Sequence, residues 1–131
     1  MRIARWSRLA SSFSIKGLGG LQASLARVVS ASNAAARRVV SDEVRAVDRD
    51  ASGFAPVDSG ELVDGIVGRA NGLDGEVEAT ARHSVFVEGG TYKDDPQPFM
   101  APAAEASRVR FPRAAATAIG LAARSVSSGG R

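Results

Sequence analysis

Residues 18–52 read LGGLQASLARVVSASNAAARRVVSDEVRAVDRDAS, and this stretch decides the fold. Apolar side chains recur in it every three or four residues, which is the spacing of one face of an α-helix, and mostly polar side chains fill the other face. The stretch therefore predicts one long helix that stops at Gly53. Its apolar stripe consists of Leu18, Leu21, Leu25, Val28, Val29, Ala36, Val39, Val40, Val44 and Val47.

The length of this helix has a consequence for assembly. A helix of roughly 32 residues is about 48 Å long at 1.5 Å per residue. A domain of 131 residues is narrower than that. We therefore expect part of the helix to project from the domain or to lie against another subunit.

Two short stretches after the helix predict a β-hairpin. Residues 66–70 and 76–81 have strand character, and the second stretch alternates polar with apolar side chains. Residues 71–72 (Asn-Gly) and 74–75 (Asp-Gly) supply the turn between them. The hairpin is expected to turn its apolar face to the long helix and its acidic face outward. A shorter strand is predicted over residues 13–15.

The remaining chain predicts a C-terminal helix and leaves one segment open. Residues 102–126 are alanine-rich with helical spacing, and Pro112 predicts a kink or a division into two helices, because proline removes a backbone donor. Residues 83–91 fit either a helical turn ending at Gly89 or Gly90 or a third strand.

These elements together predict an α+β fold, in which a long N-terminal helix packs on a small antiparallel β-sheet and a C-terminal helix follows. We expect a basic N-terminal arm over residues 1–12, a single domain over 13–126 and a flexible tail over 127–131.

The composition limits the chemistry available to the chain. There is no cysteine and a single histidine, His83, which excludes a disulfide framework, a thiol nucleophile and a metal centre built on cysteines or several histidines. No apolar run approaches the ~18 residues of a membrane helix. Asp58 and Glu61 have the spacing of a capping box over a short helical turn, with a catalytic carboxylate pair as the alternative. We predict no catalytic residue, no cofactor, no metal and no membrane contact.

The net charge of +3 conceals an alternating pattern. Residues 1–41 hold seven basic and no acidic side chains, residues 42–95 hold thirteen acidic and five basic ones, and residues 96–131 hold five arginines and one acid. Such segregation favours contact with other copies of the chain, or with a charged neighbour, through complementary faces. The candidate residues of the N-terminal arm for contact with a partner or with DNA are Arg2, Arg5, Trp6 and Arg8.

Four blocks of sequence, in this order, resemble one protein family. FSIKGL at 13–18 resembles its opening strand and helix start, and APVDSGEL at 55–62 is similar to its APVDTGxL block. HSVFVEGGT at 83–91 resembles YAxYVEFGT, and PQPFMAPA at 96–103 resembles xQPFLRPA. The family is the gene-product-ten-like group of long-tailed phages, which are neck or tail-completion proteins of the head-tail joint.

The resemblance implies structural roles for residues in three of the blocks. Those of the second block would fix the turn from the long helix to the sheet, and those of the third would close another turn. Those of the fourth would dock the C-terminal helix, with Phe99 inserted between helix and sheet or, alternatively, exposed as an anchor for a neighbouring subunit. These residues are Pro56, Asp58 and Gly60, then Glu88, Gly90 and Thr91, and finally Pro98, Phe99 and Pro102; Leu62 and Val87 are further residues of the matching motifs.

The resemblance also implies a function without catalysis. The chain would be a virion subunit of the neck or tail, assembled in the cytoplasm of the bacterial host, that joins or completes the head-tail interface as a ring or in contact with one. Its expected partners are further copies of itself, other neck, connector or tail proteins, and the packaged DNA. Two alternatives remain: a small basic nucleic-acid-binding protein, and a hydrolase or nuclease that uses His83, Glu88, Asp94 and Asp95.

Overall fold

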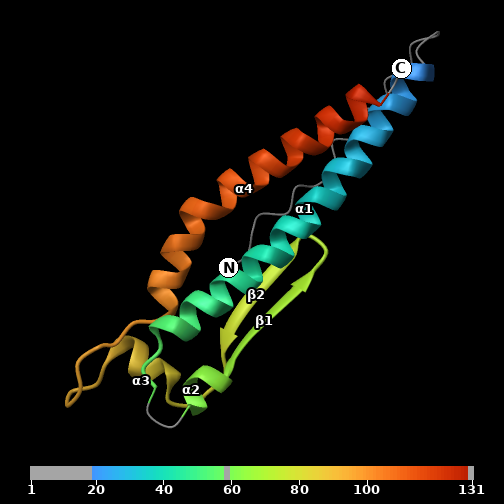
Figure 1. Ribbon diagram of the computed structural model, residues 1–131. Helices are drawn as coiled ribbons and strands as arrows, with labels where there is room; N and C mark the ends of the chain where they lie inside the picture. Colours follow the sequence, from blue (N-terminus) through green and yellow to red (C-terminus); the bar gives the residue numbers. More distant parts are fainter. Residues whose placement is uncertain (1–18, 58–59, 130–131) are drawn as a thin grey trace.

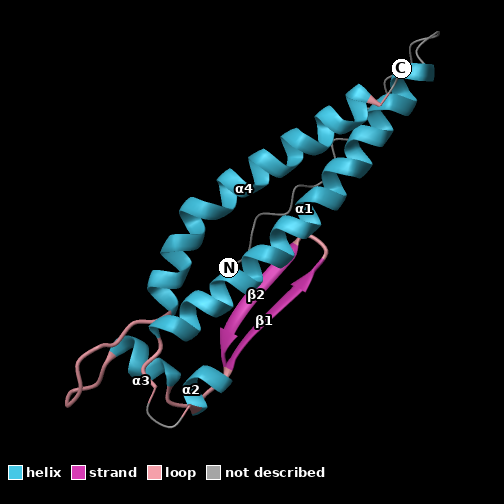
Figure 2. Cartoon of the chain, in the orientation of Figure 1, coloured by secondary structure: helices cyan, strands magenta, loops and turns pink. Residues whose placement is uncertain are grey.

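The protein forms three layers with its longest helix in the middle. The computed structural model describes residues 19–57 and 60–129. Figure 1 shows the C-terminal helix running alongside the long helix in the opposite direction, with the β-hairpin on the other side of the long helix. Figure 2 shows the same arrangement coloured by secondary structure. The elements are α1 (Gly19–Phe54), α2 (Glu61–Asp64), β1 (Ile66–Asn71), β2 (Asp74–Ala79), α3 (Ser84–Gly89) and α4 (Met100–Ser128). The predicted α+β fold is confirmed.

The long helix α1 has 36 residues, slightly more than the sequence predicts. At 1.5 Å per residue it is about 54 Å long. It continues through Gly53 to Phe54, and the backbone N–H of Ala55 still donates to the carbonyl of Ala51 at 2.9 Å. Pro56 then ends it, because a residue before proline is disfavoured in the helical conformation.

The hairpin is confirmed, but its first strand is one residue longer than predicted, its second strand lies two residues earlier, and its turn is tighter. Asn71 pairs with Asp74, so only Gly72 and Leu73 form the turn, and Gly72 has a φ of 63°. Two further glycines let α1 approach the sheet closely. A Cβ atom at Gly68 or at Gly75 would lie 2.7 Å from a methyl group of Val44. The sequence analysis places Gly75 in the turn and Gly68 in a strand, and neither pattern indicates that these glycines make room for α1.

The core lies where α1, α2, β1 and α4 meet. Its central residue is Phe99, which is fully buried, so the alternative of Phe99 as an exposed anchor is wrong. The side chains packed at its rim include Val47, Val77 and Val87. The buried cluster consists of Ala51, Ala55, Leu62, Ile66, Phe99 and Ala103.

Residues 83–91 contain a helical turn and not a strand. Among the described residues the sheet has two strands, and α3 covers residues 84–89. Ser84 is buried in this helix and its hydroxyl donates to the carbonyl of Ala79 at 3.4 Å. The predicted strand over 13–15 lies outside the described residues.

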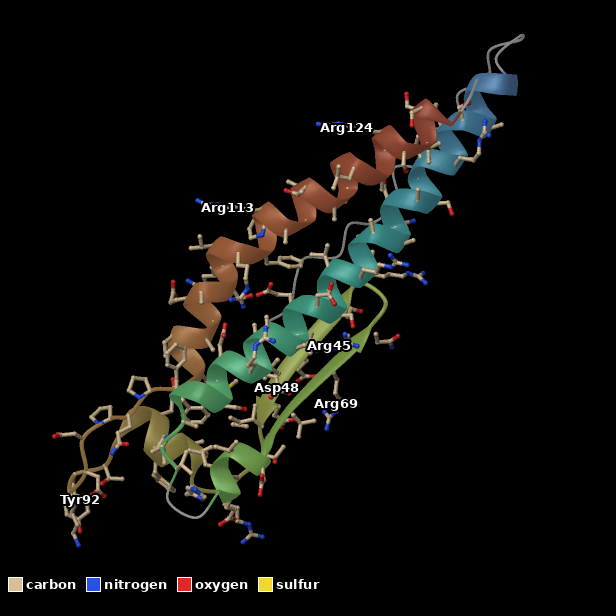
Figure 3. All side chains as sticks on the ribbon, viewed as in Figure 1. Arg45, Asp48, Arg69, Tyr92, Arg113 and Arg124 are labelled. Atoms are coloured by element: carbon tan, nitrogen blue, oxygen red, sulfur yellow. The ribbon has the colours of Figure 1, made fainter. Side chains whose placement is uncertain are left out.

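The C-terminal helix α4 runs without a break through Pro112, so the predicted division into two helices is wrong. It begins two residues before Pro102 and extends two residues past the predicted end at Val126. Figure 3 shows the helix changing direction close to Arg113, which agrees with the predicted kink. A proline inside a helix bends it because its ring collides with the preceding turn.

Candidate functional site

The block at 55–62 builds the junction from α1 into α2. Leu62 enters the core, and Gly60 precedes α2 with a φ of 80°, a conformation that favours glycine. The predicted capping box is wrong in its position, because α2 begins at Glu61 with Gly60 as its N-cap residue. Asp58 lies outside the described residues. Pro56 is half-buried and follows the end of α1.

Glu88 holds the start of α4, a role that the sequence analysis missed. One oxygen of its carboxylate accepts hydrogen bonds from the backbone N–H groups of Phe99 at 2.9 Å and Met100 at 3.0 Å, and the other accepts from Ala101 at 2.9 Å. The predicted role of Glu88 in closing the 88–91 turn is therefore wrong. Unpaired N–H groups and the helix dipole both favour an anion at a helix N-terminus.

The pKa of Glu88 reflects two opposing effects. Burial disfavours the charged form and raises the pKa, whereas the hydrogen bonds from Phe99, Met100 and Ala101 favour it. The hydrogen bonds prevail, and the pKa of Glu88 lies below its ordinary value. The carboxylate is thus ionised at neutral pH and accepts hydrogen bonds from the N-terminus of α4.

Gly90 and Thr91 close the turn that the third block predicts. The Thr91 hydroxyl oxygen accepts from the backbone N–H groups of Lys93 at 3.1 Å and Asp94 at 3.0 Å, and the Thr91 N–H donates to the carbonyl of Asp94 at 2.9 Å. Gly90 has a φ of 73° and a ψ of 176°, in a region that only glycine adopts readily. This turn returns the chain toward Phe99, and the N–H of Gln97 donates to the carbonyl of Val87 at 2.8 Å.

We expect Gly90→Ala to lower the free energy of unfolding by about 2 kcal/mol, because the backbone conformation is strained for alanine. A Cβ at position 90 would also lie 2.8 Å from the Pro96 nitrogen. The matched control is Gly89→Ala, since nothing lies within 4 Å of a Cβ at that position. Urea unfolding of the two variants measures the difference. Equal stability of the two would contradict this account of the turn.

Pro98 and Pro102 flank Phe99 and differ in burial. Pro98 is exposed, and Pro102 is half-buried in the first turns of α4. Val87 packs at the rim of the core. The described block residues thus gather at one end of the molecule, where they join α2, α3 and α4 to the end of α1.

Two of the three carboxylates of the hydrolase alternative have other uses in the structure, and the third, Asp95, is exposed. Glu88 binds the α4 terminus, and Asp94 Oδ2 accepts the hydroxyl hydrogen bond of Thr91 at 3.1 Å. His83 is half-buried before α3, and its backbone carbonyl accepts from Phe86 and Val87. Within residues 19–57 and 60–129, no group of three or more His, Cys, Asp or Glu side chains is arranged to hold a metal ion.

Arg110 of α4 forms ion pairs with two acidic residues of α1. Arg110 Nη2 lies 2.8 Å from Glu43 Oε1, and Arg110 Nη1 lies 2.9 Å from Asp50 Oδ2. Glu43 and Asp50 are seven residues apart, which places them on the same face of α1. The sequence offers no local signal for this contact, because 67 residues separate Arg110 from Glu43.

The fold brings two basic segments of the sequence together. The described parts of α1 up to residue 41 and of α4 from residue 106 contain seven arginines and no acidic residue. These two helix segments lie side by side (Figure 1), and we call them the two-helix arm. The described residues between 42 and 105 contain thirteen acids and five bases. The molecule therefore has one basic end and one acidic end.

A groove runs along α4, and we call it the α4 groove. Its volume is about 610 Å³, and Val109 and Leu121 in it are each 58% exposed. Arg113 lies in the groove and Arg124 one turn beyond it, and Figure 3 shows both pointing away from α1. The lining residues are Ala106, Val109, Arg110, Arg113, Ala114, Thr117, Ala118 and Leu121.

The outer side of the hairpin has the opposite charge. Glu76 and Glu78 are exposed, as predicted, and Glu78 lies 3.5 Å from Arg69. The side chains of Asp74 and Glu76 have no ion pair or hydrogen bond within the part of the chain that the structure describes. Leu73, at the tip, is 52% exposed. We call Leu73, Asp74, Glu76 and Glu78 the hairpin face.

The residues predicted to contact a partner or DNA, which are Arg2, Arg5, Trp6 and Arg8, lie outside the described residues. No helix among the described residues is long and apolar enough to span a membrane. Comparison of the chain with models of protein families, with curated proteins and with solved structures finds no match.

Proposed function

We propose that this chain is a structural subunit of the head-tail joint of a long-tailed phage or prophage, and that it acts through protein–protein contacts and not through catalysis. Its partners are further copies of itself and the neck, connector or tail proteins next to it in the virion. The resemblance of four sequence blocks to the gene-product-ten-like family supports the class of protein.

The observation that carries the proposal is that the described block residues stabilise the fold, whereas the surface presents separate charged and apolar regions. Block residues such as Leu62, Glu88 and Phe99 are used to hold the elements together. The surface instead offers a basic two-helix arm, an acidic hairpin face and an exposed apolar group at the end opposite the arm. In that group, Val57 is 75%, Val85 is 73% and Tyr92 is 92% exposed. Exposed apolar side chains beside segregated charge are typical of surfaces that bind other proteins.

The test is a nonsense mutation in the gene of a phage that encodes this chain. We expect DNA-filled heads without attached tails in electron micrographs of the lysate, and restored particles when the chain is supplied from a plasmid. An antibody against the chain should label the neck or the head-proximal end of the tail. Infectious particles with intact joints in the absence of the chain would overturn the proposal.

Nucleic-acid binding is the second candidate, favoured by the seven arginines without an acid in the two-helix arm. Binding to phosphates releases counterions, so the affinity for duplex DNA should fall steeply between 50 and 200 mM salt. Fluorescence anisotropy with a labelled duplex measures this fall. The acidic residues between 42 and 105 count against this candidate, because they repel phosphates.

A further inference from the structure

We propose that the α4 groove of one copy receives the hairpin face of a second copy. The inference rests on the proposed function, in which copies of the chain assemble, and it names the two surfaces that meet. The contact places the exposed side chains of Val109 and Leu121 against Leu73 of the second copy. It places Arg113 against the acidic pair Asp74 and Glu76.

Charge is the first argument for this pairing. Among the described residues, Arg108 pairs with Glu105 at 3.1 Å, and Arg110 pairs with Glu43 and Asp50. Arg113 and Arg124 are exposed, and no described acid pairs with them. On the hairpin face, Asp74 and Glu76 form no ion pair with described residues of their own copy, because Arg69, which lies opposite Glu76, is paired with Glu78. Each surface therefore presents unneutralised charge of one sign beside an apolar side chain.

Geometry is the second argument. The helix α1 lies between α4 and the hairpin, so the two surfaces cannot meet within one copy (Figure 1). The groove extends from Ala106 to Leu121, which is about 22 Å along a helix. Each strand of the hairpin has six residues, which is about 20 Å. The two surfaces are thus similar in length.

Other surfaces of a second copy fit the groove less well. Two α4 grooves facing each other about a two-fold axis would bring Arg113 close to its own equivalent near the middle of the contact. The described first half of α1 carries Arg27, Arg37 and Arg38, which would repel Arg113 as well. A DNA backbone would meet mainly alanine, valine and leucine side chains in the groove. The hairpin face brings both an apolar side chain and acids.

The type of contact determines the assembly. Because the two surfaces differ, the contact is heterologous, and each copy offers one groove and one hairpin face to its neighbours. Repetition of such a contact gives a ring when the rotation between copies closes. A contact the size of one hairpin is smaller than the roughly 800 Å² per partner of a stable interface. We therefore expect a single contact to be weak and salt-sensitive, and ring closure to stabilise it.

Charge reversal on either surface tests the proposal with the full chain. The variants are Arg113→Glu, which makes the groove acidic, and Glu76→Lys, which makes the hairpin face basic. We expect each variant alone to self-associate at least about tenfold more weakly than the wild-type chain at low salt, since like charges then face each other. Sedimentation velocity over a range of concentrations measures the association.

Mixing the two variants in equal amounts gives the sharper result. The acidic groove of Arg113→Glu then faces the basic hairpin of Glu76→Lys, and the unchanged groove of Glu76→Lys faces the unchanged hairpin of Arg113→Glu. We expect the mixture to recover the self-association that neither variant has alone. A contact between two identical surfaces would not be restored in this way.

Two matched controls change the net charge by the same amounts elsewhere. Arg82→Glu and Asp95→Lys alter exposed residues that belong to neither surface, and we expect them to associate like the wild-type chain. Thermal unfolding followed by circular dichroism must show that all four variants fold like the wild-type chain. Loss of association in the controls would assign the effect to net charge and overturn the proposal.

The remaining outcomes also decide between the alternatives. A wild-type chain that stays monomeric at low salt and high concentration overturns the proposed contact, as does a mixture of variants that stays dissociated. Binding of a labelled duplex that Arg113→Glu abolishes, without self-association of the wild-type chain, would assign the groove to DNA instead. If the wild-type chain does not self-associate but is still found at the phage neck, the proposed contact is wrong and the proposed function stands.

Discussion

Phe99→Ala is expected to lower the free energy of unfolding by about 3–5 kcal/mol, because it removes a fully buried aromatic ring and leaves a cavity. Phe99 belongs to one buried cluster with Ala51 of α1 and Ala103 of α4. These small neighbours cannot grow into the space that the ring leaves. For a domain of this size the melting temperature should fall by at least about 10 °C.

The matched control for Phe99→Ala is Phe86→Ala, which removes the same ring from a residue that is 61% exposed. We expect it to change the stability by less than about 1 kcal/mol, as most surface substitutions do. Chemical unfolding of both variants gives the comparison. A Phe99→Ala chain that melts with the wild-type chain would show that the core is not organised around this ring.

Glu88→Ala is expected to lower the free energy of unfolding by about 2–3 kcal/mol, because three backbone N–H groups at the start of α4 lose a charged acceptor. Glu88→Gln keeps the shape and one acceptor oxygen but removes the charge, so its effect should be smaller. Equilibrium unfolding in urea ranks the three chains. Equal stability of Glu88→Ala and wild type would mean that solvent replaces the carboxylate without loss.

The same residue gives a pH dependence with a defined sign. The pKa of Glu88 is lower in the folded chain than its ordinary value of 4.5, so its contribution to stability is fully present above that value. The contribution is lost as the pH falls through the lower, folded-state pKa. We expect the stability difference between wild type and Glu88→Gln to be constant near neutrality and to shrink below about pH 4. A difference that grows on acidification would contradict this sign.

The regular elements could be predicted from the sequence because their signals are local. The apolar spacing of residues 18–52 predicted α1, and the glycine-rich turn with its alternating flank predicted the hairpin. Residues 83–91 stayed undecided, since six residues are too few for periodicity to separate a helix from a strand. Pro112 does not divide α4, because the packing of α4 on α1 outweighs the loss of one backbone hydrogen bond.

The contacts that set the surfaces could not be predicted, because they join residues far apart in the sequence. Arg110 reaches Glu43 across 67 residues, and Glu88 caps a helix that starts 12 residues later with no capping residue of its own. The three charged segments could be counted from the sequence, but their placement depends on α4 folding back along α1. Only then do the described parts of the first and last segments form the basic two-helix arm.

The central position of α1 also determines the order in which the other elements can pack on it. The hairpin is close to α1 in sequence and can pack on it early, whereas α4, the described element that covers the other side of α1, is synthesised last. Contacts between residues so distant in the chain form late, because closing a long loop costs entropy first. We therefore expect α4 to dock last. Since the α4 groove exists only after that step, a chain without α4 would still offer its hairpin face but no groove, and we expect the repeated contact to form only between chains in which α4 has docked.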